Sequence, residues 1–302
     1  MTPSLPFCPD GPVVSRFVAG MWRLADWQFS VSERQRYIEA CLDMGVNTFD
    51  HADIYGNYAC EQLFGEVLGQ HQGLRQRIVL ISKCDVKLTS SRFPERRLNH
   101  YDTSAAHIIA SAEASLQNLN TSELDVLLLH RPDPLLDADE VAQAFVQLRD
   151  AGKVKHFGVS NFTPSQFELL QSRLSFPLVT NQVECSVLNF EVMHDGTLDQ
   201  AQRHRFAPMA WSPLGGGRLF HDDSPQSQRV RSTMQAIGEA HGGASLDQIA
   251  FAWLLRHPAK IIPVLGTQRT DRIERALAAS SINLSREDWF DVWRASIGHD
   301  VP

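Results

Sequence analysis

The chain has 302 residues, of which 43% are hydrophobic and 21% are charged. This composition is ordinary for a globular protein and argues against a disordered or fibrous chain. With 28 Lys and Arg against 35 Asp and Glu, the formal net charge is -7, so a nucleic-acid partner is not expected.

Neither a membrane partner nor an exported protein is expected from the sequence. The longest apolar runs, such as 126–129 and 261–265, are much shorter than the roughly 20 residues of a membrane-spanning helix. The first residues show no basic segment followed by a long apolar one, as a secretory signal would. The five cysteines are scattered, without a CxxC pair or metal-ligand spacing, which favours a reducing cytoplasm and argues against a metal site.

In chain order, the first predicted feature is a β-hairpin turn at 6–12, followed by a strand at 13–19 that ends at Gly20. Ser30 or Ser32 caps the next predicted helix. From there, short apolar runs alternate with amphipathic segments along the chain. The predicted strands begin at Val13, Asn47, Ile78, Leu124, Val154, Val179, Phe206 and Ile261.

Each predicted strand is followed by a helical segment, as at 104–119, 137–151 and 163–174. In the last of these, Thr163 is the predicted N-cap and Pro164 takes the first helical position. Strict alternation implies a parallel sheet, and eight such units close a barrel. An open doubly wound sheet is the alternative, but no strand leads into a GxGxxG turn.

Two further helices are predicted outside the repeat, at 229–240 and 285–297. The expected fold is therefore α/β, a (β/α)8 TIM barrel with an N-terminal hairpin and two extra helices. We see no linker or change in composition along the chain. Residues 1–302 are expected to form a single domain.

Ionisable side chains follow the predicted strands where each strand ends. Asp50 and Tyr55 follow the second strand, Lys83 the third and His130 the fourth. Because the carboxyl ends of barrel strands meet at one face, these four side chains are expected to converge there. Burying so many polar groups for packing alone would be costly.

The four side chains suit the protonation of a carbonyl oxygen. A phenol has an ordinary pKa near 10, and an adjacent ammonium lowers that value by favouring the phenolate. Lys83 supplies the ammonium, Asp50 holds it in place, and His130 is able to donate a hydrogen bond to an oxygen held beside Tyr55.

The contexts of these residues, FDHADIYG, LISKCD and LLLHRPD, resemble the catalytic tetrad of the aldo-keto reductases. This family consists of NADPH-dependent carbonyl reductases built on a (β/α)8 barrel. The resemblance extends over nearly the whole chain, and GMWRLADW with FDHADIYG is most similar to the family's bacterial oxidoreductase branch. Further matching motifs are GVSNF at 158–162, NQVECS at 181–186, SPLGGG at 212–217 and IPVLGTQRTDRIE at 262–274.

The resemblance implies that Tyr55 is the general acid, that Lys83 and Asp50 lower its pKa, and that His130 orients the substrate oxygen. It also implies a cofactor site, in which Trp211 stands where the family usually has a tyrosine stacked on the nicotinamide. Trp22 is the expected substrate contact, and no metal is expected. The expected cofactor-binding residues are Gly20, Met21, Ser160, Asn161, Gln182, Trp211, Ser212, Leu214, Gly216, Gly266, Thr267, Gln268 and Arg272.

The expected cofactor is NADPH, with NADH possible. Gln268 replaces a commonly basic residue and Ala276 a frequent asparagine, but Arg272 is retained with Arg269 nearby, and arginine pairs well with phosphate. The expected reaction is reduction of an aldehyde or ketone.

Two alternative functions stay open on the sequence. The first is a regulatory protein that senses redox state through a bound cofactor on the same barrel. The second is a barrel aldolase in which Lys83 forms a Schiff base.

Overall fold

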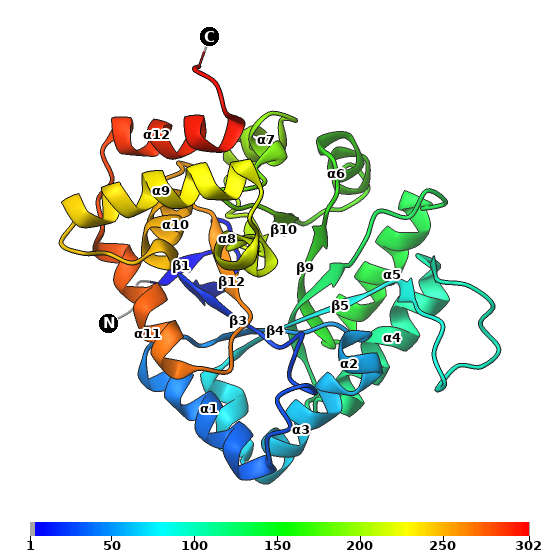
Figure 1. The fold of residues 1–302 in the computed structure, drawn as a ribbon. Coiled ribbons are helices and arrows are strands. Elements are labelled where there is room, and N and C mark those ends of the chain that lie inside the picture. The colour runs from blue at the N-terminus through cyan, green and yellow to red at the C-terminus, as the bar shows by residue number, and fades with distance from the viewer. Residues whose placement is uncertain (1–3, 302) are drawn as a thin grey trace.

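A computed structural model describes residues 4–301 of the chain. Eight parallel strands close a barrel (Figure 1), and consecutive barrel strands are neighbours around the ring, with the last pairing to the first. The predicted (β/α)8 barrel is confirmed. The barrel strands are β3 (Val18–Gly20), β4 (Thr48–Asp50), β5 (Val79–Cys84), β8 (Leu124–Leu129), β9 (Val154–Ser160), β10 (Leu178–Glu184), β11 (Met209–Trp211) and β12 (Ile262–Leu265).

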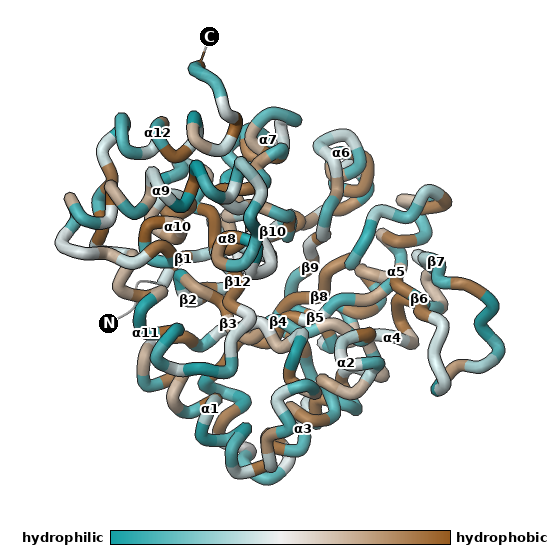
Figure 2. The backbone as a smooth tube through the Cα atoms, viewed as in Figure 1, coloured by the Kyte–Doolittle hydropathy of each residue, from teal (hydrophilic) through white to brown (hydrophobic). Residues whose placement is uncertain are grey.

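Apolar side chains in the strands explain why this sheet is covered on its outer face by helices. All six residues of β8 are buried, as expected for a strand that packs on both faces. Hydrophobic residues concentrate along the central strands, whereas hydrophilic residues line the outer helices (Figure 2). The α-helices are α1 (Val31–Asp43), α2 (Tyr55–Tyr58), α3 (Cys60–Gln70), α4 (Ala105–Asn118), α5 (Ala138–Asp150), α6 (Pro164–Gln171), α7 (Thr197–His204), α8 (Arg218–His221), α9 (Pro225–Ala240), α10 (Leu246–Leu255), α11 (Thr270–Ala278) and α12 (Arg286–Ile297).

The N-terminal hairpin is present, but the strand predicted at 13–19 was wrong as one element. It divides into β2 (Val13–Ser15), which pairs antiparallel with β1 (Ser4–Pro6), and the barrel strand β3. The break follows from Ser15, whose backbone N–H turns away to the side chains of Asn47 and Thr48, 3.1 Å away in each case. Because Asn47 directly precedes β4 and Thr48 is its first residue, the hairpin lies at the amino-terminal end of the barrel, opposite the strand ends that carry the polar residues.

Two helices outside the repeat, α9 and α12, lie side by side at one edge of the molecule (Figure 1). A third helix, α10, was not predicted. It lies between β11 and β12 and is the barrel helix that follows β11, and seven of its ten residues are buried. A helix that is apolar on nearly every side shows no amphipathic period, and this is why the pattern did not reveal it.

The long segment after β5 contains a small two-stranded sheet of β6 (Val86–Lys87) and β7 (His100–Tyr101). Figure 1 shows this segment projecting from the barrel beside α4. Within residues 4–301, no helix combines the length and the apolar character that crossing a bilayer requires. Over the same residues, no group of His, Cys, Asp or Glu side chains is arranged to hold a metal ion.

Candidate active site

Lys83 lies at the centre of a group of polar side chains at the carboxyl ends of β4 and β5. Its Nζ donates hydrogen bonds to Oδ1 and Oδ2 of Asp50, each at 2.8 Å, and to the backbone oxygen of His51 at 2.8 Å. The hydroxyl oxygen of Tyr55 is 3.0 Å from the same nitrogen. The structure thus brings three of the four side chains predicted to be catalytic into direct contact.

This group is almost entirely buried. Lys83 is 0% exposed and Asp50 is 2% exposed. The carboxylate has one further donor, Nε2 of Gln182, which lies 2.9 Å from Oδ1. A buried ion pair is tolerated only when its remaining hydrogen-bonding capacity is satisfied, and Gln182 with the His51 carbonyl meets that requirement.

The pKa of Tyr55 differs from the sequence-based expectation. Burial raises the pKa of the phenol above its ordinary value, the Lys83 ammonium lowers it, and the Asp50 carboxylate raises it further. The ammonium therefore acts in the predicted direction, but burial outweighs it and the phenol stays protonated at neutral pH. Burial also lowers the pKa of Lys83, but Asp50 and Tyr55 raise it more, so the amine stays charged.

His130 completes the group from the end of β8. Its ring centroid is 5.8 Å from that of Tyr55, with the two rings nearly perpendicular. Burial, together with the positive charge of Lys83, lowers the pKa of His130 well below its ordinary value. The imidazole is therefore neutral, and its buried Nδ1 has no hydrogen-bond partner among the described residues.

Two further ionisable side chains, those of buried His51 and partly buried Asp53, lie near Lys83. Neither ring nitrogen of His51 has a hydrogen-bond partner among residues 4–301, and burial followed by the charge of Lys83 lowers its pKa to about 3. Asp53 accepts a hydrogen bond from Ser111 at 2.8 Å, while burial and the nearby Glu61 raise its pKa to about 7. Their contacts with Lys83 come from the backbone, through the carbonyl oxygen of His51 and the N–H of Asp53.

A second polar group lies across the barrel mouth at the ends of β9, β10 and β11. The indole Nε1 of Trp211 donates to Oδ1 of Asn161 at 2.9 Å, and Nδ2 of Asn161 donates to Oγ of Ser160 at 2.8 Å. The Ser160 hydroxyl in turn donates to the backbone oxygen of Gln182 at 2.8 Å. Since Gln182 also binds Asp50, the residues predicted to hold a nicotinamide are hydrogen bonded to the Lys83 group.

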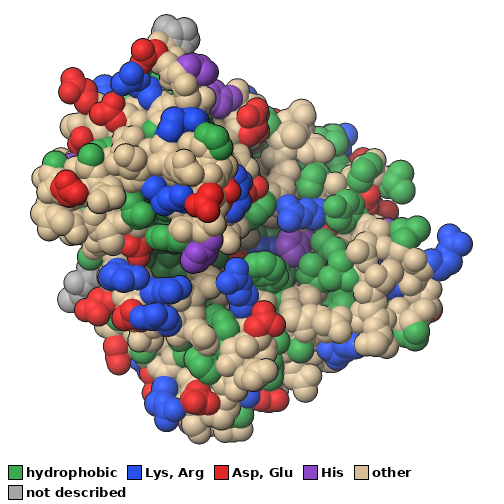
Figure 3. Space-filling view, in the orientation of Figure 1, with side chains coloured by type: hydrophobic (Ala, Val, Ile, Leu, Met, Phe, Trp, Pro, Cys, Tyr) green, Lys and Arg blue, Asp and Glu red, His purple; other side chains and the backbone are tan. Residues whose placement is uncertain are grey.

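A cavity of about 680 Å³ lies beside the mouth, between the ends of β11 and β12. The face shown in Figure 3 is hollowed across its middle, and Lys and Arg side chains gather along the rim. The predicted cofactor-binding residues that line this cavity are Leu214, Gly216, Gly266, Thr267 and Arg272.

Other predicted cofactor residues do not line it. Gly20 and Met21 are buried at the end of β3, where a side chain on Gly20 would come within 2.9 Å of Val264. Gln268 is exposed beyond the wall of the cavity. Ser212 shapes the wall through its backbone, which has a φ of 48° and accepts a hydrogen bond from the N–H of Gly215.

The cavity has the features that a dinucleotide needs. Three consecutive glycines, Gly215 to Gly217, have φ values of 62°, 64° and 99°, a conformation that lets the backbone approach a ligand closely. Arg275 is paired with Asp247 at 3.4 Å, and Arg269 is paired with Asp271. Arg272 lines the cavity without a carboxylate within 4.0 Å among the described residues, so its charge is available to a phosphate.

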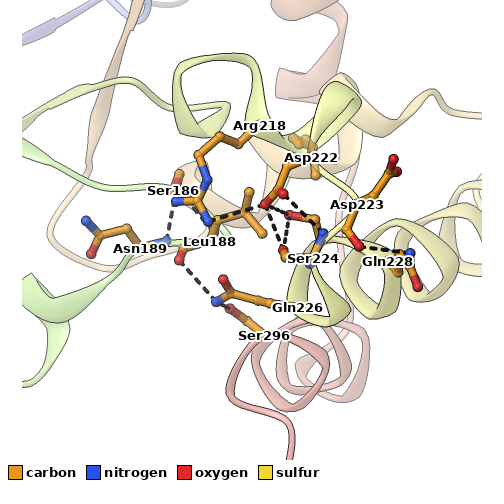
Figure 4. Close-up of polar contacts among 12 residues, drawn as sticks. Ser186, Leu188, Asn189, Arg218, Asp222, Asp223, Ser224, Gln226, Gln228 and Ser296 are labelled. Carbon is orange, nitrogen blue, oxygen red and sulfur yellow. Dashed lines mark hydrogen bonds and ion pairs between the residues drawn. The ribbon is translucent and has the colours of Figure 1, made fainter.

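The segment that follows the glycine run is held in place by its own polar contacts. Asp222, between α8 and α9, accepts hydrogen bonds from the backbone N–H of Ser224 at 3.1 Å and from its hydroxyl at 2.7 Å, with Arg218 3.4 Å away (Figure 4). These bonds from Ser224 contribute most to lowering the pKa of Asp222 to about 2. Gln226 ties the start of α9 to the backbone oxygen of Leu188 at 3.2 Å (Figure 4).

Two charged residues at the mouth were given no functional role from the sequence. Arg131 follows His130 directly, and its guanidinium carbon is 5.6 Å from the centroid of the Trp211 ring. Asp85 has a φ of 92° and accepts a hydrogen bond from the N–H of Arg131 at 3.2 Å. Their position just after strand ends was the available signal. The predicted substrate contact, Trp22, is 59% exposed in the loop after β3.

Comparison with known proteins shows which family the chain belongs to. The sequence model of the Aldo/keto reductase family matches residues 16–296. Oxidoreductase YdhF of Escherichia coli (strain K12) is 50% identical over 302 residues, which covers 100% of both chains. A 6-dehydroglucose reductase of Agrobacterium fabrum (strain C58) is 46% identical, with 95% of this chain and 96% of that protein covered.

Among solved structures, the crystal structure of the thermostable aldo-keto reductase Tm1743 with the inhibitor epalrestat has the same fold. Its TM-score is 0.81 at 23% sequence identity, and the match covers 97% of this chain and 99% of that one. The family match and the relatives above show more than the fold. The chain belongs to the aldo/keto reductase family and is an NAD(P)H-dependent oxidoreductase.

Proposed function

We propose that the protein reduces an aldehyde or ketone to the alcohol with NADPH, and that Tyr55 supplies the proton. The observation that carries this proposal is the position of the Tyr55 hydroxyl, 3.0 Å from an ammonium that also binds both oxygens of Asp50. A phenol next to a fixed positive charge is suited to give up a proton to an oxygen on which negative charge develops.

Each of the four side chains has a distinct role in this proposal. Tyr55 keeps its proton at neutral pH because burial raises its pKa, and Lys83 stabilises the phenolate that remains after the proton moves to the carbonyl oxygen. Asp50 keeps Lys83 charged and oriented. His130, neutral at this pH, donates a hydrogen bond to the same substrate oxygen.

When bound, the nicotinamide supplies the hydride that adds to the carbonyl carbon. Ser160, Asn161 and Gln182 would hold its carboxamide, with Trp211 against the ring. Leu214 and the glycines after it would take the pyrophosphate. The unpaired guanidinium of Arg272 in the cavity wall supports NADPH over NADH, because it would meet the phosphate that distinguishes the two.

The class of substrate is proposed from a relative. The Agrobacterium fabrum protein that is 46% identical to this chain is named a 6-dehydroglucose reductase. We therefore propose a hydroxylated aldehyde of the sugar type as the substrate. All five cysteines are free thiols, which supports the proposal of a cytoplasmic protein. The closed barrel, whose strands run from β3 to β12, supports the proposal of a single domain over residues 1–302.

A panel of carbonyl compounds tests the proposal. We expect the purified protein to oxidise NADPH in the presence of glyceraldehyde, and NADH more slowly. Binding of NADPH in a thermal-shift titration without turnover of any aldehyde or ketone would instead favour the redox-sensing alternative. The aldolase alternative predicts that borohydride traps a substrate on Lys83, but that nitrogen is buried and hydrogen bonded to Asp50, His51 and Tyr55.

A further inference from the structure

Arg131 lies at the barrel mouth between the two polar groups described above. It is the first residue after His130, and its guanidinium carbon is 5.6 Å from the centroid of the Trp211 ring. The indole is fixed by its own hydrogen bond to Asn161. The Asp85 carboxylate accepts a hydrogen bond from the backbone N–H of Arg131 at 3.2 Å. The backbone of Arg131 is therefore held by Asp85, and its guanidinium lies near the fixed Trp211 ring.

The guanidinium of Arg131 has no acceptor within the described part of the chain. No carboxylate oxygen lies within 4.0 Å of the guanidinium and it donates no hydrogen bond to the described residues, although Arg131 is partly buried. The nearby Asp133 is engaged elsewhere, by the Thr103 hydroxyl at 3.0 Å and the N–H of Leu135 at 2.9 Å. A guanidinium carries five N–H donors and accepts none, so Arg131 offers unused donors at the mouth.

The charge of Arg131 is also close to the groups that would act on the carbonyl. It contributes to the lowered pKa of His130 and opposes the effect of burial on the pKa of Tyr55. The free donors thus lie beside His130 and the Trp211 ring, next to the side chains that would hold the carbonyl group, rather than at a remote surface. Arginine matches two acceptor oxygens at once better than lysine does, because its donors form a planar fork.

We propose that Arg131 determines substrate specificity, by binding acceptor oxygens that an aldehyde carries close to its carbonyl carbon. A hydroxyl of a sugar and a carboxylate both provide this chemistry. The inference rests on the proposed function, since it concerns the substrate of the same site. It assigns Arg131 a role in choosing the substrate and none in the transfer of hydride or proton.

The test compares two matched pairs of aldehydes, propanal with glyceraldehyde and butanal with succinic semialdehyde, using NADPH and the intact protein. In Arg131→Met, we expect kcat/KM for the oxygenated member of a pair to fall roughly 10- to 100-fold, and that of the unsubstituted member by less than about 3-fold. Arg131→Lys keeps the charge without the fork and should fall between the wild type and Arg131→Met.

The ratio of kcat/KM for the two members of a pair separates a change in specificity from a general loss of activity. A misfolded variant, or one with an altered Tyr55 pKa, would lose activity on both members equally, and that result overturns the proposal. A loss confined to glyceraldehyde identifies a hydroxyl as the partner, and one confined to succinic semialdehyde identifies a carboxylate. Arg97→Met, which removes an exposed charge from the segment after β5, is the control and should leave both ratios unchanged.

The same experiment distinguishes a failure of the proposed function from a failure of the proposal for Arg131. If the wild type reduces no aldehyde in either pair, carbonyl reduction itself is refuted before Arg131 is considered. If the wild type reduces all four and the Arg131→Met ratios equal those of the wild type, only the role of Arg131 is refuted.

Discussion

Replacing Lys83 by Met removes the charge around which the site is built and keeps a side chain of similar length. The ammonium donates to both oxygens of Asp50, and without it the carboxylate, 2% exposed, has Gln182 as its side-chain donor. Removing one partner of a buried pair leaves an uncompensated charge, which costs about 3–5 kcal/mol of the free energy of unfolding. We expect a loss of that size in urea denaturation.

The double variant Asp50→Asn with Lys83→Met distinguishes the charge from the packing. It has no buried carboxylate to leave unpaired, so it should recover most of the free energy of unfolding that Lys83→Met loses. Its turnover should stay as low as that of Lys83→Met, roughly 100-fold or more below the wild type, because Tyr55 still lacks the ammonium. A double variant as unstable as Lys83→Met would refute the reasoning.

Three further predictions follow from single contacts. Since the pKa of His51 falls from 6.5 to about 3 on folding, the unfolded chain binds a proton in this window that the folded chain does not, so stability falls as pH drops through it. His51→Leu should remove up to about 1.4 kcal/mol per pH unit of that dependence, measured as urea midpoints, and an unchanged slope would contradict it. Arg272→Gln should raise KM for NADPH roughly 10-fold or more and leave KM for NADH within about 3-fold of the wild type. The control is Arg269→Gln, which should change neither KM because the charge of Arg269 is already paired with Asp271. An equal rise in KM for both cofactors would argue against the role of Arg272. In Gly65→Ala the new carbon would lie 1.9 Å from the Asn118 backbone oxygen, so the free energy of unfolding should drop by about 1–3 kcal/mol or more. In the control Gly73→Ala the new carbon meets nothing within 4 Å, so the free energy of unfolding should change by less than about 0.5 kcal/mol. Similar losses in both variants would contradict the packing argument.

Strand ends were the most informative part of the sequence. Asp50, Lys83 and His130 each end an apolar run, and neighbouring barrel strands bring such ends together whatever their separation along the chain. The fold followed from the same alternation. The prediction of individual elements failed at 13–19, where Ser15 turns its backbone N–H to Asn47 and Thr48. It also failed at α10, whose buried surface leaves no amphipathic period.

The sequence alone does not reveal properties that depend on the surroundings of a side chain, such as its pKa and its hydrogen-bond partners. The raised pKa of Tyr55 reflects how deeply the phenol is buried, and a charged neighbour in the sequence does not reveal that balance. The hydrogen bond from Gln182 to Asp50 joins residues far apart in the chain. The proposal for Arg131 depends on the lack of a hydrogen-bond acceptor for its guanidinium among the described residues, and only the structure reveals this.

The most direct test of the account is the rate of hydride transfer in a single turnover of Tyr55→Phe with NADPH already bound. The variant lacks only the hydroxyl that lies 3.0 Å from Lys83. We expect the rate for a glyceraldehyde substrate to fall roughly 100-fold or more, with the Kd for NADPH within about 3-fold of the wild type. A rate within about 3-fold of the wild type would show that the proton comes from another group.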